Sequence, residues 1–117
     1  MSYVDGFVLA VPKANIEAYR EMARLGGKVW MEHGALSYVE CFGEDTPYGE
    51  LTSFPRAVQA TDDEVVVFSW VTYADRASRD AVMAKVMVDE RMKPWMDKMP
   101  FDGKRMIFGG FEAFLEL

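Results

Sequence analysis

The strongest constraint in this sequence is that its strand-like segments are apolar on both sides. In EVVVFSWVTY (64–73), Val65 and Val67 would point to one face of a sheet while Val66 and Phe68 point to the other. An antiparallel sheet with one face in water normally alternates apolar with polar residues. The segments at 3–11 and 106–117 also lack that alternation. Both faces of the sheet therefore need cover, and an identical sheet from a second copy is the most economical cover.

The order of segments predicts a βαββαβ chain. Strands are predicted at 3–11, 36–43, 64–73 and 106–117, helices at 16–33 and 76–88, and a second helical piece at 89–99 that restarts near Pro94. Within the long connection 44–63, residues 56–60 could lengthen the sheet. Asn15 and Asp75 are expected to cap the two long helices, and Gly34 to end the first in a left-handed conformation. In the second long helix, a stripe of small residues is expected to pack on the sheet: Ala77, Ala81, Ala84 and Val88.

This order is the split βαβ pattern of a ferredoxin-like sheet. We expect an α+β protomer in which both helices cover one face of an antiparallel sheet, and a single domain spanning residues 1–117. The remaining face would meet a partner's sheet, which makes the chain a homodimer.

Four stretches of the sequence carry a resemblance to a known family. They are YVDGFVLAVPK at the start, GALSYVECFGED after the first helix, VVFSW in the third strand and MPFDGKRMIFGGFE near the end. The chain resembles the uncharacterised bacterial family typified by the YbaA protein, within the dimeric α/β-barrel superfamily. The resemblance implies a ferredoxin-like protomer whose sheet packs on its partner's sheet to close a barrel. It implies no activity, because superfamily relatives range from cofactor-independent monooxygenases and isomerases to proteins without a known role.

Charge and composition exclude several classes of function. The net charge is −6, with 19 acidic and 13 basic residues and no basic run, so binding to nucleic acid is disfavoured. No apolar stretch approaches the roughly 18 residues that span a bilayer, and the first residues predict a strand rather than a signal peptide. A single cysteine, Cys41, favours the reducing cytoplasm, and we expect it to be a small buried apolar residue. One histidine and one cysteine without ligand spacing predict no metal site and no cofactor.

His33, the only histidine, is the first candidate for catalysis. It lies at the predicted end of the first helix, where the favoured interpretation is a ring that caps the helix and the alternative is a general base at a pocket mouth. Three acidic residues, Asp5, Glu40 and Glu112, lie within apolar strands. Asp5 and Glu112 are further catalytic candidates if they face inward, and Arg105 is then their expected partner.

Soft and aromatic side chains predict where a ligand would lie. The candidate pocket residues are Trp30, Met83, Met87, Trp95, Arg105 and Phe108. Gly26 and Gly27 in the first helix indicate either close packing on the sheet or room for a ligand. The leading hypothesis is a protein that binds a small apolar or aromatic molecule. The alternatives are a cofactor-independent monooxygenase or isomerase, and a structural or regulatory homodimer without a ligand.

Overall fold

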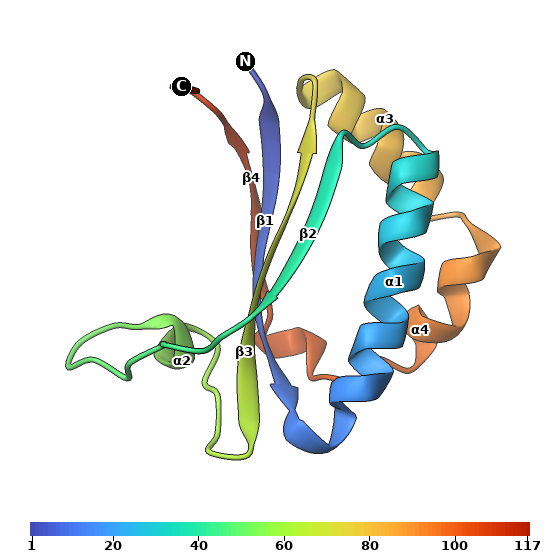
Figure 1. Ribbon diagram of the computed structural model, residues 1–117. Coiled ribbons are helices and arrows are strands. Elements are labelled where there is room, and N and C mark those ends of the chain that lie inside the picture. Colours follow the sequence, from blue (N-terminus) through green and yellow to red (C-terminus); the bar gives the residue numbers. More distant parts are fainter.

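A computed structural model describes residues 1–117 and contains one antiparallel sheet of four strands. The strands are β1 (Tyr3–Pro12), β2 (Ser37–Phe42), β3 (Glu64–Tyr73) and β4 (Ile107–Glu112), in the spatial order β2-β3-β1-β4. Every neighbouring pair runs antiparallel (Figure 1). This order confirms the ferredoxin-like α+β fold, in which the two halves of the chain interleave their strands.

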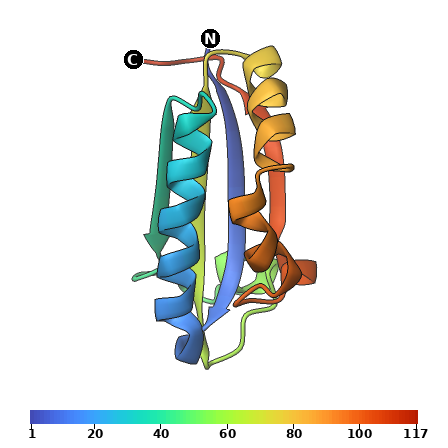
Figure 2. The same ribbon diagram turned by 90° about the vertical axis from the view of Figure 1, so that its right-hand side faces the viewer.

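Three helices lie on one face of this sheet (Figure 2). They are α1 (Ile16–Glu32), α3 (Arg76–Val86) and the short α4 (Lys93–Asp97), with single 3-10 turns at Lys13–Asn15, Glu90–Met92 and Gly103–Arg105. Pro94 occupies the first turn of α4, so the restart predicted there is confirmed. No helix is long and apolar enough to cross a bilayer.

Helix α3 turns a different side to the sheet than its alanine stripe predicted. Val82 and Val86 are its buried residues, whereas Ala77, Ala81 and Ala84 face solvent. The prediction was wrong because larger β-branched side chains bury more apolar area than alanine does, and they occupy a face about one residue round the helix.

The end of α1 confirms the prediction for Gly34. This glycine has φ +116°, a left-handed conformation that side chains with a Cβ rarely adopt. The turn directs Ala35 N–H back to Trp30 O at 3.1 Å, and the chain then enters β2. His33 is the capping residue at the C-terminus of the helix, with its own N–H bonded to Val29 O.

The connection between β2 and β3 contains a helical turn, not extra strand. Residues Phe54–Ala57 form α2, so the predicted extension of the sheet at 56–60 is wrong. Ser53 accepts a hydrogen bond from Arg56 N–H at 3.1 Å, and Pro55 sits in the first turn, where its missing N–H costs nothing. These two local signals favour a helix start over a strand.

The last strand ends at Glu112, five residues before the predicted end at Leu117. Glu112 lies opposite Tyr3, the first residue of β1, so no backbone of β1 remains for residues beyond it to pair with. Beyond it only Ala113 N–H bonds back, to Ser2 O at 2.9 Å, so strand propensity continues past the end of the ladder with β1.

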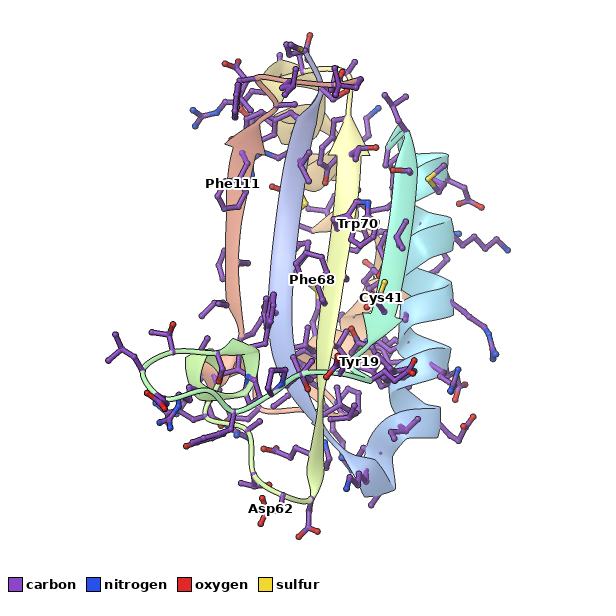
Figure 3. All side chains as sticks on the ribbon, turned by 60° about the vertical axis from the view of Figure 1, so that its left-hand side comes forward. Tyr19, Cys41, Asp62, Phe68, Trp70 and Phe111 are labelled. Atoms are coloured by element: carbon purple, nitrogen blue, oxygen red, sulfur yellow. The ribbon has the colours of Figure 1, made fainter.

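The second face of the sheet is apolar and largely open (Figure 3). Phe68, Trp70 and Phe111 project from it, and Phe68 and Phe111 are 42% and 62% exposed. Only its lower part is covered, where Val58 beyond α2 packs against Val8 of β1. Cys41 also lies on this face and is exposed, so the prediction that it is buried was wrong. Cys41 lies within β2, as predicted, but no other part of the same chain covers it.

Candidate functional site

A cavity of about 160 Å³ lies between α1 and the helix-facing side of the sheet. Its walls are mostly apolar and include Phe7, Leu9, Met22, Trp30, Val71 and Phe101. Four polar side chains also line it: Tyr19, Tyr38, Glu40 and Ser69. A dry apolar cavity with a few convergent polar groups is the usual form of a small-molecule site.

Glu40 and two tyrosines form a hydrogen-bonded cluster at one wall of this cavity. Tyr19 Oη donates to Glu40 Oε1 at 2.6 Å, and Tyr38 Oη donates to Glu40 Oε2 at 2.8 Å. Tyr38 and Glu40 are two apart on β2 and so share the helix-facing side, while Tyr19 descends from α1. Each carboxyl oxygen therefore has its own phenol donor.

The cluster holds a carboxyl that is easier to protonate than one in water. Burial raises the pKa of Glu40, and the hydrogen bonds from Tyr19 and Tyr38 offset part of that increase. Burial, followed by the neighbouring carboxyl, raises the pKa of both phenols well above the usual value for tyrosine. At neutral pH the phenols thus stay protonated and donate to Glu40, and Glu40 is the group that can exchange a proton with a ligand.

Ser69 adds a second polar group next to the cluster. It is 5% exposed and lies directly opposite Glu40 in the β2–β3 ladder and opposite Phe7 in the β1–β3 ladder. Directly opposite residues on one face of a sheet have Cβ atoms about 5 Å apart. Glu40 and Ser69 therefore form the polar part of the cavity floor, and Phe7 continues it as apolar surface.

Asp5 is buried in a separate network and does not line the cavity. Arg79 Nη1 donates to its Oδ1 at 3.0 Å, and Tyr73 Oη donates to its Oδ2 at 2.9 Å. Trp30 Nε1 in turn donates to Tyr73 Oη at 3.2 Å. The carboxylate is neutralised and bonded through both oxygens, which is the arrangement of a structural ion pair.

Arg105 was predicted to pair with an inward carboxylate on β1 or β4, and that prediction was wrong. It binds Glu64 at 2.6 and 2.8 Å and Asp102 at 3.1 Å, and so ties the turn before β4 to the start of β3. The hydrogen bonds from Arg105 hold the pKa of Glu64 down to about 2. Glu112 is exposed on the edge strand and has no ion pair.

His33 also lies outside the cavity lining. Its Nε2 is 2.9 Å from Asp89 Oδ2, and Asp89 is further bonded by Arg91 at 2.8 Å. Arg91 reaches back to Glu32 at 2.8 Å. The ring thus joins the end of α1 to the chain that follows α3.

Among the predicted pocket residues, Trp30 lines the cavity, whereas Met83, Met87, Trp95, Arg105 and Phe108 do not. Phe108 lies on the edge strand β4 and is 71% exposed, and Met87 is 55% exposed. The residues that sequence reasoning did not select are Tyr19, Tyr38 and Ser69, together with Glu40, which was noted only as a strand carboxylate. For Tyr38, Glu40 and Ser69 the signal was a polar side chain within an otherwise apolar strand, and it could be interpreted only once the strand register was known.

Comparison with known proteins shows which family the chain belongs to. The "Uncharacterized protein YbaA" of Escherichia coli (strain K12) is 52% identical over 116 residues, which cover 99% of each chain. Among solved structures, a dimeric ferredoxin-like protein from an uncultured marine organism has a TM-score of 0.57 at 14% identity, covering 99% of this chain and 98% of its own. The cofactor-independent oxygenase SnoaB from Streptomyces nogalater, solved as a mutant, has a TM-score of 0.56 at 13% identity, covering 99% and 94%. These two similarities show the fold alone. The profile of the family described as "Protein of unknown function (DUF1428)" matches residues 2–103, and the chain belongs to that family.

Proposed function

We propose that the protein binds a small molecule with a single aromatic ring in the cavity between α1 and the sheet. The observation that carries this proposal is an apolar cavity of about 160 Å³ with one polar wall. An engineered apolar cavity of about 150 Å³ is known to bind benzene, so the volume suits one ring and not a fused ring system. Glu40 and Ser69 would orient a hydroxyl or similar substituent on that ring.

Fluorobenzene tests this proposal, because its fluorine signal reports binding to a site of this size without any knowledge of the natural ligand. The parent protein should broaden and shift the signal in a saturable way. Ser69→Leu should abolish the effect by placing a larger apolar side chain in the cavity, and Ser78→Leu on α3 is the matched control that should retain it. Absence of saturable binding to the parent, or equal binding to Ser69→Leu, would refute the proposal.

A second candidate function is cofactor-independent oxygenation, which the raised pKa of Glu40 favours. A carboxylate beside an apolar cavity can accept the proton of a phenol and leave an electron-rich phenolate. The oxygenase SnoaB shares the fold. Hydroquinone is a simple probe: incorporation of an oxygen atom from labelled O2 into the ring, above the uncatalysed level and lost in Glu40→Gln, would support this candidate. Equal rates with and without protein would leave binding as the function.

We also propose that the protein is a homodimer whose open sheet faces pack together in the cytoplasm. Phe68 and Phe111 are exposed on a face without charges at its centre, and a structural neighbour is dimeric. Light scattering during gel filtration should give about twice the chain mass of 13.3 kDa. Phe111→Lys should shift that mass towards the monomer, whereas a monomeric parent would contradict the proposal. A dimer that binds no ring would support the alternative of a structural or regulatory protein.

A further inference from the structure

The outer surface beside the cavity is a groove between α1 and β2, which we call the α1–β2 groove. Its helix side is formed by Ala23, Arg24, Gly27, Lys28 and Met31, and its strand side by Leu36, Ser37, Tyr38 and Glu40. A shallower depression continues it towards the start of α1, with Tyr19, Arg20 and Phe42 joining Ala23, Arg24 and Glu40. Since β2 is an edge strand, no further strand closes this side of the sheet.

Glu40 is common to the inner cavity and to both parts of the outer surface. Tyr38 lines the cavity and the α1–β2 groove, and Tyr19 lines the cavity and the shallower depression. The hydrogen-bonded cluster of these three side chains therefore lies between the cavity and the outer groove.

The glycine pair of α1 shapes this wall. A Cβ on Gly27 would lie 3.0 Å from Tyr38 Cδ1, and a Cβ on Gly26 would lie 3.1 Å from Tyr38 Oη. Glycine inside a helix costs about 1 kcal/mol relative to alanine, so two in succession need a compensating role. Their role here is to let the Tyr38 ring lie against the helix beside the cavity. The glycines thus serve both close packing and the ligand cavity, the two roles that the sequence left open.

The charges on the groove contrast with those of the whole chain. Arg24 and Lys28 are exposed, four residues apart on α1, and neither forms an ion pair. Arg20, the next arginine on this side, is held by Glu17 at 3.4 Å and stacks on Phe42. Glu40 is the only carboxylate that lines the groove, and both of its oxygens already accept hydrogen bonds from Tyr19 and Tyr38. A protein of net charge −6 thus leaves two cations unpaired beside the entrance.

We propose that the ligand is an aryl carboxylate with a short spacer, whose ring occupies the cavity while its carboxylate lies in the α1–β2 groove against Arg24 and Lys28. This inference rests on the proposed function, because it assigns the ring to the same cavity. The spacer follows from the geometry: the carboxylate lies on the solvent side of Glu40 and the ring on the inner side. Arginine and lysine hold a carboxylate by charge-assisted hydrogen bonds.

A pair of ligands that differ only in charge tests the inference. Binding of 3-phenylpropionate and 3-phenylpropionamide to the parent is measured by calorimetry at low ionic strength. The acid should bind about tenfold more tightly than the amide, a difference of about 1.4 kcal/mol, because two exposed cations contact the carboxylate and not the amide. In Arg24→Gln/Lys28→Gln the ratio should fall to about one while the affinity of the amide is unchanged. Added salt should reduce the ratio for the parent.

The matched control is Lys85→Gln/Lys93→Gln, which removes the same charge from exposed lysines that do not line the groove. It should keep the tenfold preference. Equal affinity of acid and amide for the parent would overturn the inference, and the proposed function would stand if fluorobenzene still binds. Equal loss of preference in both double variants would also overturn it, because a general charge effect would then explain the result. Undiminished binding of the acid to Ser69→Leu would place the ring outside the cavity and contradict both proposals.

Discussion

Replacing Arg79 by methionine should destabilise the protein severely, because it leaves the Asp5 carboxylate buried without its cation. The Asp5 side chain is 7% exposed and that of Arg79 is 21% exposed, with 3.0 Å between the paired atoms. Breaking a buried ion pair by removing one partner costs about 3–5 kcal/mol. Tyr73 still donates to Asp5, and Arg79 is partly solvated, so the lower end of that range, about 3 kcal/mol, is expected. For a chain of this length each kcal/mol lowers Tm by about 4 °C, which gives about 12 °C.

Thermal melts and urea unfolding at neutral pH measure this effect, and a double-mutant cycle isolates its cause. Asp5→Asn/Arg79→Met should be more stable than the sum of the two single losses, with a coupling energy of about 2 kcal/mol, since no buried charge is left unpaired. Arg76→Met on the same helix removes only an exposed pair with Asp80 at 3.9 Å and should change stability by less than about 0.5 kcal/mol. A melt of Arg79→Met within about 2 °C of the parent, or strict additivity in the cycle, would refute the structural role of Asp5 and return it to the catalytic candidates.

Four further predictions concern Glu40, Glu64, Gly34 and His33. The pKa of Glu40 is raised in the folded state, so the folded protein binds this proton more tightly than the unfolded chain does. The free energy of unfolding of the parent should therefore fall as pH rises above about 4.5. Glu40→Gln should not show this fall when the urea midpoint is measured across the same pH range. Glu64 has the opposite effect, because its pKa is lowered to about 2 in the folded state and its ionised form stabilises the fold above pH 4.5. Glu64→Gln should therefore cost about 2 kcal/mol of unfolding free energy at neutral pH and nothing near pH 2. A difference between variant and parent that stays constant through an acid titration would contradict this. Gly34→Ala should lower the free energy of unfolding by about 1–2 kcal/mol, because alanine is strained at a φ of +116°. The new Cβ would add no clash, since it would lie an ordinary 3.5 Å from Val82. His33→Gln keeps a side-chain donor for Asp89 and should melt close to the parent. Unchanged melting of Gly34→Ala would instead make His33 the leading catalytic candidate.

The order of elements and the fold could be predicted from the sequence because the signals are local. The continuous β-branched and aromatic run of β3, the period near 3.6 in α1 and the glycine at position 34 each depend on residues close together in the chain. The apolar character of both sheet faces is local as well, and it predicted the open surface seen around Phe68 and Phe111. The same kind of signal failed at the end of β4, where propensity continues beyond the available partner.

The candidate site depended on tertiary structure, because its members come from different elements and are chosen by register. Glu40 is close in sequence to Tyr38, but only the packing of α1 on the sheet brings Tyr19 to its other oxygen. Asp5 forms its ion pair with Arg79, 74 positions away on α3, and not with Arg105 before β4, which the sequence suggested. A one-residue slip of a strand sends every side chain to the opposite face, so no reading of composition can decide which polar residue faces the cavity. Local periodicity thus determined which segments form strands and helices, and only the pairing of those segments decided that a carboxyl, two phenols and a serine share one cavity.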